Sequence, residues 1–120
     1  VNDRMVKNFS LIRVLDSLTI LDTQKIMSII EELIVTLEER LALKLTNPRK
    51  IGLYVHISCM VERLIRQVEI TEFADLEQFV FTHQREIRVI KDAVSVLETI
   101  YSVQIPLPEI CYIHNILFLD

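Results

Sequence analysis

The stretch DTQKIMSIIEELIVTLEERLALKLT, residues 22–46, predicts an amphipathic α-helix and decides the fold class. Apolar side chains recur in it every three or four residues, and charged side chains occupy most positions between them, which is typical of a helix that buries one face. Asp22 precedes the first turn and is suited to cap it. The apolar stripe is formed by Ile26, Ile30, Leu33 and Leu37.

More helices are expected downstream of this one. The sequence TNPRK predicts a new helix start, with Asn47 as the cap and Pro48 in the first position, and this helix should run to about Gln67. The acidic segment 69–77 predicts a loop or a short connecting helix. We therefore expect the chain to turn back on itself after two long helices.

The C-terminal third predicts the rest of the bundle. A helix should begin at Asp75 or Thr82, and prolines 106 and 108 should end it. Pro108 opens a last helix that is apolar nearly all round and is therefore buried. We predict an all-α fold, a compact bundle of about five helices with no internal repeat.

Composition places the chain among single globular domains. It has 120 residues, 51% of them hydrophobic, with one Gly and a net charge of −4. We expect residues 1–21 to form a lead-in helix or linker and residues 22–120 to form the domain, as a fragment of a larger protein. Acidity argues against direct nucleic-acid contact, and no apolar run is long enough for a membrane span. Two cysteines fit a cytoplasmic protein without a disulfide framework.

His56 is the residue that most needs an explanation. It lies in the apolar helical stretch YVHISCMVERLIRQ, residues 54–67, on a stripe that also carries Arg49 and Arg63. Arg63 is two turns further on, roughly 10.5 Å along the axis, and its side chain should lean back toward His56. Such a basic setting suits a phosphoryl group on the imidazole. A solvated histidine with no role is the plain alternative.

Other histidine chemistry is less well supported. His56 with Cys59 and Cys111 with His114 have spacings that could form a Cys2His2 zinc site, but Cys111 lies in a helix predicted to be buried. We expect no bound metal and no cofactor. We also expect His83 to be a partly exposed residue without a chemical role and His114 to be buried. No glycine turn or oxyanion loop accompanies Cys59, so we expect no enzyme.

Two motifs resemble those of a known family. The first is an apolar helix in which His56 is followed by Arg63, and the second is IPLPEICYI, residues 105–113, with Glu109 at its centre. Together and in this order they resemble the PTS regulation domain, or PRD, over about residues 22–119. The stretches DSLTILDTQKI and HISCMVER are most similar to the C-terminal PRD of levanase-regulator-type, sigma-54-dependent transcriptional activators.

The resemblance implies a function as well as a fold. PRDs are helical bundles that usually dimerise and are phosphorylated on histidine by the phosphocarrier HPr or by a IIB component of the sugar phosphotransferase system. It implies phosphorylation of His56, and we expect Arg63 and Arg49 to stabilise the phosphoryl group. The family's second histidine would fall at Ile116, so we predict a single site. The alternative is a helical dimerisation or scaffold module that is not phosphorylated.

Overall fold

The computed structural model describes residues 21–119, which form five helices and no strand. The all-α prediction is therefore confirmed for this part of the chain, and the lead-in helix expected within residues 1–21 falls almost entirely outside it. The helices are α2 (Thr23–Leu41), α3 (Asn47–Ile65), α4 (Leu76–Thr82), α5 (Gln84–Tyr101) and α6 (Leu107–Phe118). None of these helices combines the length and the apolar character that crossing a membrane requires.

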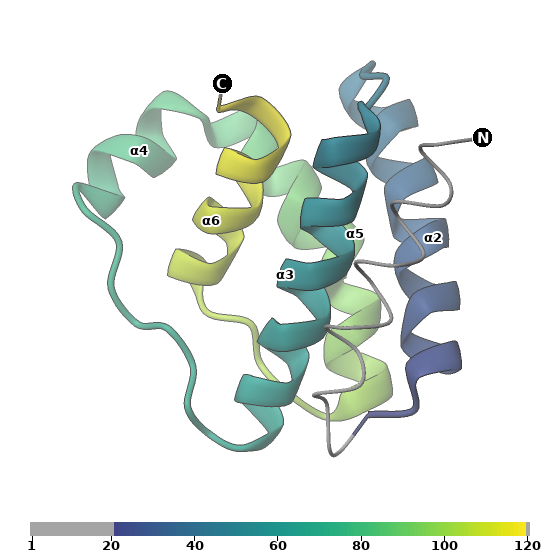
Figure 1. Cartoon of the computed structure of the whole chain (residues 1–120). Helices are drawn as coiled ribbons and strands as arrows, with labels where there is room; N and C mark the ends of the chain where they lie inside the picture. The colour runs from purple at the N-terminus through teal and green to yellow at the C-terminus, as the bar shows by residue number, and fades with distance from the viewer. Residues whose placement is uncertain (1–20, 120) are drawn as a thin grey trace.

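Four long helices make the body of the bundle (Figure 1). α2 packs against α3 and α5, and α6 also packs against both α3 and α5; α3 and α5 make a smaller contact with each other. The short α4 packs on α5 and α6 at one edge, after a loop that spans residues 66–75. The core is therefore enclosed by α2, α3, α5 and α6, and α4 contributes no buried residue to it.

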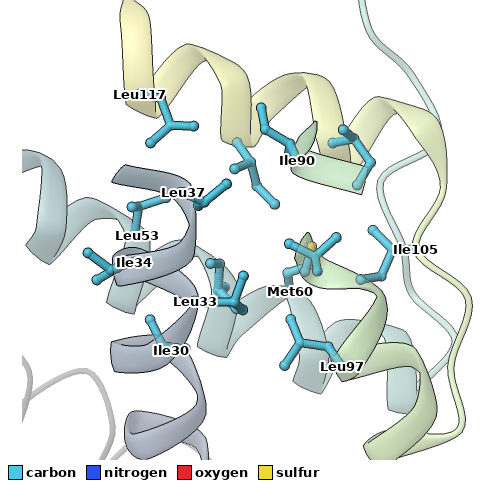
Figure 2. Packing of buried hydrophobic residues seen from close by; sticks show 14 of the residues in the cluster. Ile30, Leu33, Ile34, Leu37, Leu53, Met60, Ile90, Leu97, Ile105 and Leu117 are labelled. Carbon is cyan, nitrogen blue, oxygen red and sulfur yellow. The ribbon is translucent and has the colours of Figure 1, made fainter. Parts of the chain in front are cut away.

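The apolar periodicity of the sequence is what fills this core. The predicted stripe of α2 is buried, with Ile26, Ile30 and Leu37 fully shielded from solvent. Leu53 and Met60 reach the same interior from α3 (Figure 2). The other two walls are supplied by Ile90, Leu97, Ile105 and Leu117, from α5, the turn after it and α6. Burial of these side chains is the main source of stability.

Several helix boundaries differ from the sequence-based prediction. α2 begins after Asp22, whose side chain accepts a hydrogen bond from the Lys25 amide, as expected for a cap. However, α2 ends at Leu41 because Ala42 adopts the left-handed conformation. Thr46, not Asn47, caps α3. The predicted helix beginning at Asp75 or Thr82 is in fact two helices, separated at His83.

The structure contains an internal repeat, so the expectation of no repeat is wrong. α2 with α3 and α5 with α6 are two similar helix pairs, related by a constant offset of 60 residues, as from 38 to 98. Ala42 and Ser102 end the first helix of each pair in the same left-handed conformation. The Glu38 and Glu98 carboxylates then accept hydrogen bonds from the Leu45 and Ile105 amides, each at 2.8 Å.

The repeat is difficult to detect in the sequence because few residues are identical between its two halves. Five matching pairs are identical: Gln24 with Gln84, Ile30 with Ile90, Leu37 with Leu97, Glu38 with Glu98, and Pro48 with Pro108. Elsewhere the two halves share mainly apolar character, which every buried helix face needs. The relationship is visible in the backbone geometry that the two turns share, and this geometry cannot be read from the sequence.

Glu38→Ala and Glu98→Ala should each destabilise the domain by about 1–2 kcal/mol, because each leaves a backbone N–H of its turn without an acceptor. Chemical denaturation followed by circular dichroism measures the change. Glu39→Ala, which removes an exposed neighbour, is the matched control and should stay within about 0.5 kcal/mol of the wild type. Equal effects of all three variants would contradict the structural role of Glu38 and Glu98.

Candidate functional site

The predicted stripe of α3 faces α6 and is not a solvated flank. Arg49, Gly52, His56 and Arg63 are all half-buried. A Cβ atom on Gly52 would lie 3.3 Å from Ile116, so α3 and α6 approach closely there. Arg49 donates a hydrogen bond through Nη1 to the Ile116 carbonyl at 2.8 Å. His56 therefore lies at a helix–helix boundary, with one side toward the protein and one toward solvent.

The inner side of His56 meets a buried carboxylate. Glu109, in the first turn of α6, has a side chain with no exposure to solvent, and its Oε1 lies 3.7 Å from His56 Nε2. Nε2 is itself buried and has no hydrogen-bond partner at this distance. His56 and Glu109 are far apart in the chain, so no local sequence pattern predicts this contact.

Arg63 pairs with the same carboxylate. Its Nη2 donates to both carboxylate oxygens of Glu109, at 2.9 and 3.0 Å, and the Ile70 amide donates to Oε2 at 3.2 Å. A carboxylate without such partners would cost several kcal/mol to bury. Arg63 is thus placed beside His56, as predicted, but its guanidinium is engaged by Glu109 and is only 30% exposed.

The outer side of His56 opens into a pocket. This pocket has a volume of about 570 Å³, and Arg49 and Ile116 line it with His56. Thr46, Pro48, Tyr112, Asn115 and Leu119 complete the lining. Because the His56 side chain is 20% exposed while its Nε2 is buried, the accessible surface belongs to other atoms of the side chain.

Ile116 occupies the place in the second helix pair that His56 occupies in the first. The offset of 60 residues relates these two positions, and it also relates Glu109 to Arg49. Two contacts match accordingly: Glu109 with His56 at one place, and Arg49 with the Ile116 backbone at the other. The position at which a second histidine would be expected therefore lines the same pocket as the first, but carries an apolar side chain.

Burial sets the protonation of His56. Desolvation lowers the pKa of His56 below its usual value, and the nearby Arg63 lowers it further, although Glu109 acts in the opposite direction. The imidazole is therefore neutral at pH 7 and keeps one nitrogen lone pair. A neutral imidazole is the form that can act as a nucleophile.

The remaining histidines lie elsewhere. His114 is buried and His83 half-buried, and their ring centroids are 4.5 Å apart. Burial first, and His83 second, lower the pKa of His114, whereas Glu86 raises it. Within residues 21–119, the group of three metal-ligand side chains that the fold assembles is His83, Glu86 and His114. The alternative Cys2His2 set is not assembled there, and burial raises the pKa of both the Cys59 and the Cys111 thiol.

Comparison with known families agrees with the two motifs. The model of the PRD domain matches residues 19–119. The chain belongs to the PRD family. It is therefore a PTS regulation domain, a module of regulatory proteins, as the resemblance of its motifs implied. Comparison with curated proteins and with solved structures finds no match.

Removing the partner of the buried carboxylate should be costly in this PRD. Arg63→Met should lower the free energy of unfolding by about 3–5 kcal/mol, because Glu109 would remain buried without its counterion. Arg66→Met, at an exposed position three residues further along, is the matched control. Urea denaturation compares the two, and similar small losses would show that the Arg63–Glu109 pair adds little.

Acid should weaken the domain through His56. Its pKa is lowered in the folded protein, so the unfolded chain binds this proton first as the pH falls below about 6.5. The contribution of the neutral His56 side chain to stability is complete above that pH. It is lost as the pH falls from the pKa of the unfolded chain to the lower pKa of the folded protein. His56→Gln should reduce the decline of unfolding free energy between pH 7 and pH 5, with His114 responsible for part of the remainder. An unchanged decline in His56→Gln would contradict the assignment.

Proposed function

We propose that this PRD accepts a phosphoryl group on His56 and that the modification regulates a transcription factor of a sugar operon. One observation carries the proposal: His56 lines an open pocket with Arg49, while its inner nitrogen faces the buried carboxylate of Glu109 at 3.7 Å. A histidine with no role would not need this arrangement of an accessible edge, an adjacent cation and an orienting carboxylate.

The geometry supports a defined chemical role for each group. With its proton on Nε2, toward Glu109, the neutral imidazole keeps its lone pair on Nδ1. That lone pair attacks the phosphorus of a phosphohistidine donor, an N–P bond forms on His56, and the donor's N–P bond breaks. The donor's imidazole nitrogen recovers a lone pair. Glu109, whose Oε1 lies 3.7 Å from Nε2, stabilises the positive charge that develops at this nitrogen, as carboxylates do for catalytic histidines.

Two arginines supply positive charge near the acceptor, but they have different hydrogen-bond partners. Arg49 lines the pocket beside His56 and is placed to contact a phosphoryl group there. Arg63 can contact the phosphoryl group only by sharing its bonds to Glu109. Because a phosphoryl group carries about −1.5 to −2 charges, it competes with the Glu109 carboxylate for Arg63. Phosphorylation would then loosen the contact that holds α6 against α3.

The proposed donor is HPr or a IIB component of the sugar phosphotransferase system. The His56 and Arg63 motif and the Glu109 motif support this choice through the family that they define. The stretches around residues 16–26 and 56–63 favour a parent protein of the levanase-regulator type, a cytoplasmic sigma-54-dependent activator. We further propose that the domain acts as a homodimer whose arrangement responds to charge at His56.

A scaffold role is the second candidate, and α4 is the observation that favours it. α4 has no buried residue, and its Phe81 is 70% exposed. An exposed aromatic side chain of this kind is common where a helical module meets a partner. In this alternative the domain dimerises and His56 is never phosphorylated.

Phosphoenolpyruvate, the general phosphotransferase proteins and a panel of IIB components should label wild-type protein with an acid-labile phosphoryl group. His56→Ala should abolish the label, whereas His83→Ala, the matched control at another half-buried histidine, should retain it. Circular dichroism establishes that both variants fold. Label that persists in folded His56→Ala would refute the site, and no label from any donor would leave the scaffold role.

Charge at His56 should alter the dimer. Reversing a two-state equilibrium requires about 5.5 kcal/mol of differential interaction, and two or three charge-assisted hydrogen bonds of about 1.5–3 kcal/mol each can supply it. Sedimentation velocity of wild type and His56→Asp should give dimers that differ in affinity or shape. Monomers in both samples at high micromolar concentration would contradict dimerisation. The same dimer in both would contradict the switch.

A further inference from the structure

A second cluster of reactive side chains lies away from His56, where α4, α5 and α6 meet. The ligand atoms of His83, Glu86 and His114 all lie within 4.8 Å of one another. His83 Nδ1 is 3.7 Å from Glu86 Oε1, and the two imidazole rings have centroids 4.5 Å apart with a 43° tilt. We propose that these three side chains bind one divalent transition-metal ion, with Zn²⁺ as the best chemical fit.

The donor set selects the class of metal. Two imidazole nitrogens and one carboxylate oxygen suit Zn²⁺, Co²⁺ or Ni²⁺, whereas Mg²⁺ and Ca²⁺ prefer oxygen ligands. Metal–ligand bonds of about 2.0–2.2 Å require donor atoms about 3.3–3.5 Å apart in a tetrahedral site. The His83–Glu86 separation of 3.7 Å is close to this value, and the other separations do not exceed 4.8 Å, so binding needs the side chains to move closer by about 1 Å or less on average. Three protein ligands leave a fourth position for water.

The fold orients the two imidazoles toward each other. His83 lies at the junction between α4 and α5, and Glu86 occupies the first turn of α5. His114 is 5% exposed and packs against Phe79, at a centroid distance of 5.1 Å, and against Phe118, at 4.6 Å. These contacts restrict the rotation of the buried ring, which lowers the entropy cost of binding a metal. The half-buried His83 and Glu86 leave an entry path from solvent.

An ion at this place would join the α4–α5 junction to α6. α4 is otherwise attached without any buried residue of its own. The cluster therefore gives a reason for the break at His83, which splits two helices that the sequence suggests could be one. This proposal departs from the expectation that the chain binds no metal, because His83 and His114 are brought together only by the fold. It is independent of phosphorylation at His56.

Untagged full-length chain, treated with chelator and then dialysed, should bind one Zn²⁺ per chain in calorimetry, with a dissociation constant on the order of micromolar. Bound Zn²⁺ should also raise the thermal midpoint, since it binds only the folded state. His83→Gln and Glu86→Gln, both at half-buried positions, should weaken Zn²⁺ binding about tenfold or more. The matched controls His56→Gln and Glu77→Gln should bind as the wild type does.

Nuclear magnetic resonance of the wild-type imidazoles provides a test that requires no variant to fold. Zn²⁺ should shift the ring signals of His83 and His114 together and leave those of His56 in place. No saturable binding below millimolar Zn²⁺, full binding by folded His83→Gln, or a shift of the His56 signals in place of the other two would each overturn the proposal. Co²⁺ in place of Zn²⁺ should give visible absorption bands of a low-coordinate site, and bands of the free aqueous ion alone would count against it.

Discussion

The buried carboxylate of Glu109 adds a polar link to the apolar contacts that hold α3 and α6 together. It belongs to α6, accepts hydrogen bonds from Arg63 of α3, and accepts another from the Ile70 amide in the loop that leads to α4. Three segments thus converge on one charged group that is fully shielded from water. Because an unpaired carboxylate in this place would be costly, each partner is needed by the others.

The same carboxylate connects stability with the proposed regulation. His56 is 3.7 Å from Glu109 and shares its neighbour Arg63. A phosphoryl group on His56 would introduce a second anion close to the half-buried Arg63, which Glu109 already engages. The Arg63–Glu109 ion pair links α3 to α6 in the unmodified protein. Under the proposed function, a negative charge at His56 would weaken this ion pair. A solvated arginine without a buried partner would provide no such coupling.

The internal repeat shows that the two helix pairs contribute different side chains at matching positions of the site. Two similar helix pairs place His56 and Ile116 at matching positions on the wall of one pocket, and Glu109 and Arg49 at matching positions beside them. The first half of the repeat contributes His56 and the Arg49 cation, and the second half contributes the Glu109 carboxylate that faces His56. At the position that matches His56, the second half places the apolar side chain of Ile116.

The sequence alone determined the helical class, the long helices and the family motifs, because these depend on local periodicity and on short spacings such as that from His56 to Arg63. It misplaced the end of α2, the cap of α3 and the break at His83, since Ala42 and His83 carry no strong local signal. Tertiary structure alone decided that Arg63 is engaged by Glu109, that Glu109 faces His56, and that His83 lies against His114. These contacts join residues 31–53 positions apart, and such pairings follow from how whole helices pack, which no short stretch of sequence specifies.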